Sequence, residues 1–230
     1  MRPLAVDIDG TLTRTADDVG LDPRVFDALR AYSEHAPVVI ATGKAFPFPV
    51  ALCRYLDLPN RVIAENGGVT LCESAGLTRD GDSEAATAVA DAYRAAGHGL
   101  GWETPDLVNY WRETELAVAR DQPLDPLVAI AADHGLDVVD TGYAYHVKAP
   151  GVNKGTGLET ITDDLGYQPE EFLAIGDSEN DTELFERAGE SYAVANADET
   201  AKAAADTVTE ASFADGFLEA IERVSDDTVR

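Results

Sequence analysis

The sequence predicts an α/β fold: a doubly wound, Rossmann-like parallel sheet interrupted by a smaller α+β unit. Short apolar runs alternate with stretches whose apolar residues recur at helical spacing, which is the pattern of βαβ units. Acidic residues directly follow two of the apolar runs, at the position where open α/β sheets bind ligands. The pattern changes between residues 78 and 149, which locates the inserted unit.

The individual elements follow from these runs and from helix signals such as Asp22-Pro23. Before the insertion we expect strand 4–8, a helix from residue 21, strand 38–41, helix 49–56 and strand 62–64. After it we expect a helix ending near 165, strand 172–175, a helix from 182, strand 192–195 and helix 213–224. The insertion itself should contain helix 83–96, strands 107–111 and 115–119, helix 126–134, and strands 136–140 and 143–148. The core domain is therefore predicted to comprise residues 1–78 and 151–230, with a second domain at 79–150.

The most informative motif is Asp7-Ile8-Asp9-Gly10-Thr11, at the end of the first strand. Residues two apart in a strand share a side, so Asp7 and Asp9 should emerge together. Two such carboxylates resist joint ionisation unless a cation neutralises one or one stays protonated for acid–base work. Gly10 permits a sharp turn, and Thr11 offers a hydroxyl to an anion. An ordinary strand-to-loop turn has the same residues, so this motif alone leaves both interpretations open.

A second acidic cluster, Gly176-Asp177-Ser178-Glu179-Asn180-Asp181, follows the run 172–175. Oxygen ligands from two such loops suit an octahedral Mg²⁺, and neither loop contains Cys or His. Asp and Asn also cap solvated helices, which is the alternative for this loop taken by itself.

Two further segments complete a predicted phosphate site. Thr42-Gly43-Lys44 ends the second strand and offers a hydroxyl and amides to a phosphoryl group. Lys154 is a flexible cation that can pair with a phosphate and with a carboxylate. Lys44 and Lys154 are two of only four lysines in the chain, although both also fit ordinary surface positions.

Taken in order, Asp7-Ile8-Asp9-Gly10-Thr11, Thr42, Lys154 and the cluster 176–181 resemble the four motifs of the haloacid dehalogenase-like phosphohydrolases. The resemblance implies Asp7 as nucleophile, forming an aspartyl-phosphate, and Asp9 as general acid and then base. Thr42, Gly43 and Lys154 would hold the phosphoryl oxygens. The implied Mg²⁺ ligands are Asp7, Asp9 through its carbonyl, Asp177, and Asp181 directly or through water. Thr11, Lys44 and Asn180 would be supporting; position 44 is more often Arg in related enzymes, which leaves the role of Lys44 open.

The insertion lies at the second of this family's two cap sites, the C2 type. Together with the stretch 150–155, this layout resembles the archaeal phosphoglycolate phosphatases, which implies hydrolysis of 2-phosphoglycolate to glycolate and phosphate. Sucrose-phosphate-like or broad sugar-phosphate phosphatases and phosphomutases share similar architecture and stay as alternatives. A phospho-accepting signalling module is an alternative of another class. The order of the motifs speaks against it, because a receiver's accepting Asp would lie on a later strand.

Specificity should come from the cap, because a lid over a phosphate site contacts the leaving group. Its candidates to meet an anionic leaving group are Arg112, Arg120, His146 and Lys148. Each of them is equally well explained as a solvated charge or as cover for apolar surface.

Composition sets the remaining expectations. The net charge of −26 makes nucleic acid and anionic membranes poor partners and favours a halophilic, salt-rich cytoplasm, where screening relieves self-repulsion. Cys53 and Cys72 are too few for a disulfide scaffold and are predicted to be buried thiols. No apolar run reaches the length of a signal peptide or a membrane span. The sequence leaves a homodimer open.

Overall fold

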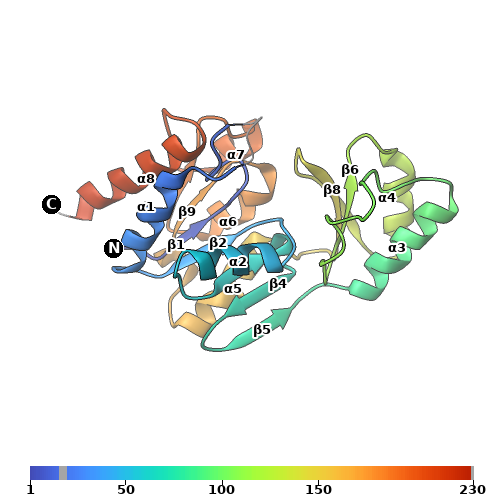
Figure 1. Ribbon diagram of the computed structural model, residues 1–230, viewed down its shortest axis with the longest axis horizontal. Coiled ribbons are helices and arrows are strands. Elements are labelled where there is room, and N and C mark those ends of the chain that lie inside the picture. The colour runs from blue at the N-terminus through green and yellow to red at the C-terminus, as the bar shows by residue number, and fades with distance from the viewer. Residues whose placement is uncertain (16–19, 229–230) are drawn as a thin grey trace.

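The computed structural model of the protein describes residues 1–15 and 20–228, and the side chains as far as residue 224. Within this part of the chain there are two sheets. An eight-stranded sheet has the order β11-β10-β9-β1-β2-β3-β4-β5, and a three-stranded sheet has the order β6-β8-β7. Figure 1 shows the two sheets as separate bodies joined through residues 80–82 and 149–153. No helix among the described residues is long and apolar enough to cross a membrane.

The large sheet is parallel from β11 to β3 and antiparallel from β3 to β5. Its strands are β1 (Leu4–Val6), β2 (Val38–Ala41), β3 (Arg61–Ala64), β4 (Val69–Cys72), β5 (Gly76–Arg79), β9 (Leu173–Gly176), β10 (Glu190–Ala193) and β11 (Thr207–Val208). The core helices are α1 (Pro23–Ser33), α2 (Pro47–Tyr55), α5 (Lys154–Leu165), α6 (Thr182–Arg187), α7 (Glu199–Ala204) and α8 (Phe213–Thr228). Three short 3₁₀ turns complete it: η1 (Glu65–Gly67), η2 (Pro169–Glu171) and η3 (Glu179–Asp181).

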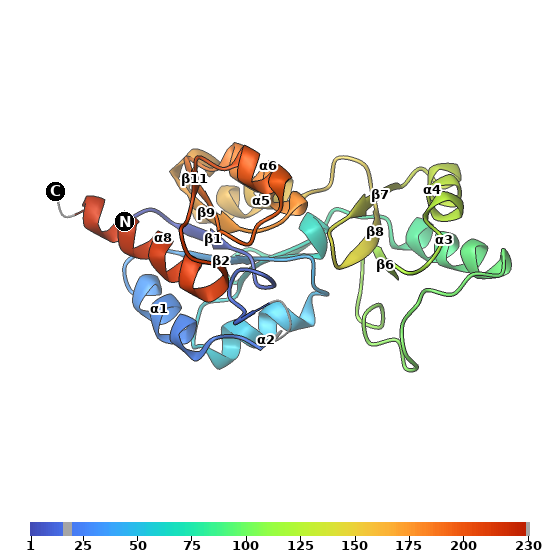
Figure 2. The same ribbon diagram turned by 90° about the horizontal axis from the view of Figure 1, so that it is seen from above.

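Helices cover both faces of this sheet, as Figure 2 shows. Because successive strand residues point to opposite faces, Leu4 and Val6 pack with the apolar sides of α1, α2 and α8. Ala5, between them, packs with α5, α6 and α7 on the other face. The central strands β1, β2 and β9 therefore contain no polar side chain, as expected for strands buried on both faces, and the predicted doubly wound parallel core is confirmed.

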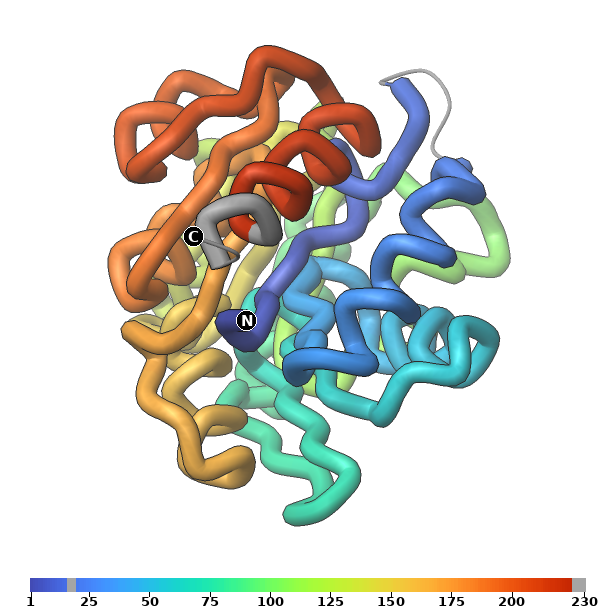
Figure 3. The backbone as a smooth tube through the Cα atoms, turned by 90° about the vertical axis from the view of Figure 1, so that its left-hand side faces the viewer, coloured from blue at the N-terminus to red at the C-terminus, as the bar shows by residue number. Residues whose placement is uncertain are grey.

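The smaller sheet is antiparallel and carries two helices of its own. It consists of β6 (Leu116–Ala119), β7 (Asp137–Asp140) and β8 (Ala144–Lys148), with α3 (Ser83–Ala95) and α4 (Leu124–Asp133) packed against it. Its core centres on Val89, Tyr93, Val118, Leu127 and Val147. We call this body the cap; the exact boundaries at 79 and 150 stay predictions. Figure 3 views the molecule from the end that carries the core, so the N-terminus lies toward the viewer and the cap lies behind the core.

The strand predicted at residues 107–111 is wrong, because this segment forms turns. The Asp106 carboxylate accepts hydrogen bonds from the amides of Val108, at 3.1 Å, and Asn109, at 3.0 Å, which bends the chain into an Asx-type turn. The side chain of Asn109 then bonds both the N–H and the C=O of Ala117 in β6, at 2.8 and 2.9 Å. The Asn109 side chain thus makes, at the start of β6, the pair of backbone hydrogen bonds that a neighbouring strand would otherwise make.

The hairpin β4–β5 is absent from the expectations above. Its strands follow η1 so closely that no helical pattern separates them from β3, and β5 is largely exposed. The short elements α7 and β11 are likewise absent, because six and two residues give too few repeats of either period.

Candidate active site

Asp7 follows β1, the strand that lies between β9 and β2 in the middle of the core sheet. Its N–H bonds the carbonyl of Ile175 at 3.0 Å, which extends the ladder by one residue and fixes the side chain at the carboxyl edge. The residue is 4% exposed. Burial raises the pKa of Asp7, Lys154 opposes this, and the negative charges of Asp181 and Asp9 add to it.

Lys154 is the buried cation of the site. Its Nζ lies 3.0 Å from Asp7 Oδ1 and 2.6 Å from Asp181 Oδ1. It is the first residue of α5, where the helix dipole disfavours a positive charge, and the Asn153 cap fixes this position by accepting the Thr156 N–H at 2.8 Å. Burial also opposes the ammonium, but Asp181 and Asp7 outweigh it and raise the pKa of Lys154.

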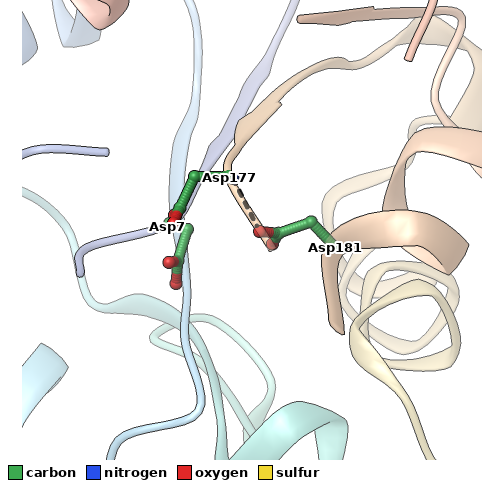
Figure 4. Close-up of side chains that lie close together, drawn as sticks. All are labelled: Asp7, Asp177 and Asp181. Atoms are coloured by element: carbon green, nitrogen blue, oxygen red, sulfur yellow. Dashed lines mark hydrogen bonds between the residues drawn. The ribbon is translucent and has the colours of Figure 1, made fainter. Parts of the chain in front are cut away.

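The loop after β9 brings Asp177 and Asp181 to the same place (Figure 4). Asp181 Oδ2 accepts the N–H groups of Asp177, at 3.0 Å, and Ser178, at 3.2 Å, while its Oδ1 faces Lys154. Asp177 Oδ1 accepts the hydroxyl of Thr11 at 2.9 Å. Burial, followed by the negative charges of Asp7 and Asp181, raises the pKa of Asp177.

This carboxylate cluster fits a metal ion. Asp7, Asp177 and Asp181 each offer an oxygen, and these atoms lie within 4.8 Å of one another. The raised pKa values of Asp7 and Asp177 mean that their negative charges are incompletely compensated by the protein. A cation placed between them would remove the repulsion, and a set made only of carboxylate oxygens suits a hard cation.

Thr42 follows β2, which pairs with β1 on the side opposite β9, and Asp9 contacts the loop that Thr42 begins. Lys44 Nζ lies 2.9 Å from Asp9 Oδ2, with both side chains partly exposed. The buried Thr42 hydroxyl accepts the Lys44 N–H at 3.1 Å, so this side chain holds its own loop in a turn. The structure thus gives Lys44 a partner, Asp9, that the sequence did not indicate.

A cavity of about 530 Å³ joins these groups to the cap. Core residues that line it include Asp7, Asp9, Gly10, Thr42, Gly43, Lys44, Asp177, Ser178 and Asn180. Cap residues that line it are Arg112, Thr141, Tyr143 and His146. Of the four cap candidates from the sequence, Arg112 and His146 thus lie at the cavity. Arg120 instead pairs with Asp140 at 3.0 Å, and Lys148 bonds the carbonyl of Val152.

Sequence reasoning missed the turn Glu65-Asn66, which connects core and cap. Glu65 is fully buried, and its carboxylate accepts the N–H groups of Glu113 and Thr114 at 3.0 and 2.8 Å, and the Thr114 hydroxyl at 2.8 Å. Asn66 accepts a hydrogen bond from Asn180 at 2.8 Å. Their position in the sequence could have indicated this role, because Glu65 and Asn66 directly follow β3. They therefore lie at the same edge of the sheet as Asp7 and Thr42.

The fold and the arrangement of the site place the chain in a known family. A family model described as haloacid dehalogenase-like hydrolase matches residues 4–103 and 136–221, so the chain belongs to that family. The phosphoglycolate phosphatase of Natronomonas pharaonis is 66% identical over 225 residues, covering 97% of this chain and 98% of that protein. The phosphoglycolate phosphatase of Haloarcula marismortui is 58% identical over 220 residues, covering 95% of each.

Solved structures agree at the level of the fold. Thermoplasma acidophilum 0175 superposes with a TM-score of 0.84 at 22% identity, covering 97% of both chains. A haloacid dehalogenase-like hydrolase from Bacteroides thetaiotaomicron gives a TM-score of 0.77 at 21% identity, covering 97% of this chain and 99% of the other.

Proposed function

We propose that this protein is a phosphomonoesterase that hydrolyses 2-phosphoglycolate to glycolate and phosphate through an aspartyl-phosphate on Asp7. The observation that carries the chemistry is the buried carboxylate of Asp7, 3.0 Å from Lys154 and beside Asp177 and Asp181. The substrate follows from the relatives named phosphoglycolate phosphatase, at 66% and 58% identity over nearly the whole chain.

In the first step a carboxylate oxygen of Asp7 attacks phosphorus while the bond to the leaving oxygen breaks. Asp9, half exposed at the cavity, gives that oxygen its proton. In the second step Asp9 takes a proton from water, the water oxygen attacks phosphorus, and phosphate leaves with the Asp7 carboxylate restored. Two in-line displacements of this kind need positioning and charge neutralisation more than covalent help.

Lys154, Thr42 and Gly43 are proposed to hold the phosphoryl oxygens. Lys154 also keeps Asp7 oriented, and its own side chain is fixed by Asp181 at 2.6 Å. Thr42 and Gly43 line the cavity, where a hydroxyl and an amide can meet phosphoryl oxygen. Thr11 and Asn180 support the site indirectly, Thr11 through Asp177 and Asn180 through Asn66.

We propose Mg²⁺ as the cation, held by the carboxylates of Asp7 and Asp177 and by the carbonyl of Asp9. Asp181 has its oxygens occupied by Lys154 and by two backbone amides, which favours a contact through water. When bound, Mg²⁺ supplies neutralisation of the negative charge on the transferring phosphoryl group.

We also propose that the enzyme works in a salt-rich, reducing cytoplasm. The charge of −26 supports high salt, and relatives in Haloarcula marismortui and Halobacterium salinarum are consistent with it. Both cysteines are free and buried, as expected from the sequence.

The test is phosphate release in molar KCl with Mg²⁺ from 2-phosphoglycolate, several sugar phosphates and an aryl phosphate. We expect preference for 2-phosphoglycolate, no turnover by Asp7→Asn, and unchanged turnover by Asp27→Asn, whose side chain on α1 is 91% exposed. Equal turnover of all these substrates would contradict the preference for 2-phosphoglycolate and would indicate a general phosphatase. Activity retained by Asp7→Asn would exclude Asp7 as the nucleophile. Faster turnover of a sugar phosphate than of 2-phosphoglycolate would show that the proposed substrate is wrong.

A further inference from the structure

Two cap side chains present unused donors to the cavity that contains Asp7. Arg112 lies in the turn before β6, and its side chain is 4% exposed. Its Nε bonds the carbonyl of Val108 at 3.1 Å, and its Nη1 bonds the carbonyl of Gly43 at 3.0 Å and pairs with Glu115. Its second terminal nitrogen, Nη2, has no partner among the described residues, and Arg112 lines the cavity.

His146 on β8 has the same one-sided arrangement. Its side chain is 3% exposed, and Nδ1 lies 2.9 Å from Glu115 Oε1 and 3.1 Å from Asn66 Nδ2. With the Nδ1 proton directed at the Glu115 carboxylate, the imidazole turns its other nitrogen away from that partner. Nε2 has no partner in the part of the chain that the structure describes, and His146 lines the cavity.

Glu115 holds both residues in place. Its side chain is 1% exposed; burial opposes its charge, but His146 and Arg112 outweigh burial and lower its pKa to about 2. Asn66 Nδ2 donates to the second oxygen, Oε2, at 3.0 Å, and Asn66 is itself held by Asn180 of the acidic loop. The donors of Arg112 and His146 are thereby fixed by a network that reaches the loop of Asp177.

The nitrogens of this cluster indicate what it would bind. Arg112 presents Nη2 to the cavity, and His146 presents Nε2, which donates when the ring carries both protons; Glu115 on one side and an anionic ligand on the other would both favour that form. Two separate donors match the two oxygens of a carboxylate, whereas one sugar hydroxyl would engage only one of them. Nη1 of Arg112 bonds the carbonyl of Gly43, which directly follows Thr42. A carboxylate bound at Arg112 would therefore lie close to the proposed phosphate site.

We propose that Arg112 and His146 form a receptor for a carboxylate on the leaving group, with Glu115 and Asn66 as positioning residues. The proposal rests on the proposed function and deepens it, because it names the groups that select a phosphate ester bearing a nearby carboxylate. A short substrate such as 2-phosphoglycolate can then bridge Lys154 in the core and Arg112 in the cap.

The test compares 2-phosphoglycolate with 2-hydroxyethyl phosphate, which has the same two-carbon skeleton and no carboxylate. For each variant kcat and KM are measured on both substrates. His146→Asn keeps a donor near the position of Nδ1 and removes Nε2, whereas His146→Gln restores a donor near Nε2. Arg112→Gln removes the guanidinium. Arg112→Lys is the second variant, because it also removes Nη2 but keeps a positive charge beside Glu115 if Arg112→Gln does not fold. Arg120→Gln is the matched control, because Arg120 is a cap arginine paired with Asp140 away from the cavity.

We expect His146→Asn and both Arg112 variants to lose about 10- to 100-fold in kcat/KM on 2-phosphoglycolate, mainly through KM, as for one charge-assisted hydrogen bond. Turnover of 2-hydroxyethyl phosphate should change little, His146→Gln should recover part of the loss, and Arg120→Gln should match the wild type. Equal losses on both substrates would overturn the receptor and leave the proposed function standing. A wild type that does not prefer 2-phosphoglycolate to 2-hydroxyethyl phosphate would overturn the proposed function itself, and the receptor with it.

Discussion

Gly10→Ala tests whether the close approach of the first-strand loop to Asp177 positions the proposed metal site. Gly10 has φ +79, a conformation that L side chains rarely adopt. A Cβ built at this position would lie 2.0 Å from Asp177 Oδ2 and 2.7 Å from Oδ1. The added methyl group therefore strains the backbone and collides with the carboxylate.

The magnitude follows from these distances. Real Cβ contacts essentially never fall below 3.0 Å, so the 2.0 Å contact requires Asp177 or the loop to move by about 1 Å. Such a shift also breaks the 2.9 Å hydrogen bond from Thr11 to Asp177. A displacement of about 1 Å in a catalytic site can cost on the order of 100-fold in rate, and the strained backbone costs about 1 kcal/mol of stability.

Gly166→Ala is the matched control. Gly166 ends α5 with φ +74, and a Cβ there would meet nothing within 4 Å, so it reproduces the backbone strain without the collision. We expect both variants to lose similar free energy of unfolding in urea at molar KCl. Only Gly10→Ala should lose about 100-fold in kcat/KM and bind Mg²⁺ more weakly by titration calorimetry. Equal activity and Mg²⁺ affinity in the two variants would refute the positioning role of this contact.

Three further predictions concern the contact between core and cap and the charge of the chain. Glu65→Ala leaves the buried donors of Thr114 without an acceptor, so urea unfolding should show a loss of about 2–4 kcal/mol; a loss below about 0.5 kcal/mol would exclude a structural role. Glu115 has a pKa lowered from 4.5 to about 2, so its contribution is present above pH 4.5 and is lost as pH falls toward 2. The stability difference between wild type and Glu115→Gln should therefore shrink over that range, and a constant difference would contradict this ionisation. Raising KCl from 0.1 to 1 M shortens the Debye length from about 10 to 3 Å, so the melting temperature of a chain with charge −26 should rise; an unchanged value would reject the adaptation to salt.

The parallel core was predictable because its signal is local and repeated. Each buried strand is a short apolar run, and α1 and α8 have apolar residues at helical spacing. The positions of Asp7 and Asp177 at one sheet edge then follow from topology, since parallel strands end together. By contrast, residues 107–111 are rich in residues that favour strands, but the hydrogen bonds of Asp106 and Asn109 hold them in turns.

The groups that connect core and cap could not be predicted in the same way. Glu115 and His146 are separated by 31 residues and meet only when β6 and β8 pair. Asn66 is 80 residues from His146 and joins them only when the cap packs against the core. The sequence presented Arg112, Arg120, His146 and Lys148 as equivalent cations. Burial against Glu115 and the position of the cavity separate the first and third from the others.

The most direct test of the account is to trap the phosphorylated enzyme. Wild type and Asp7→Asn would be mixed with 2-phosphoglycolate labelled in its phosphoryl group, in molar KCl with Mg²⁺, and quenched in acid within a single turnover. Mass spectrometry of the digested protein should locate the phosphoryl group on Asp7 of the wild type and nowhere on the variant. Rapid phosphate release without any labelled protein, or with the label on another residue, would contradict a mechanism through Asp7.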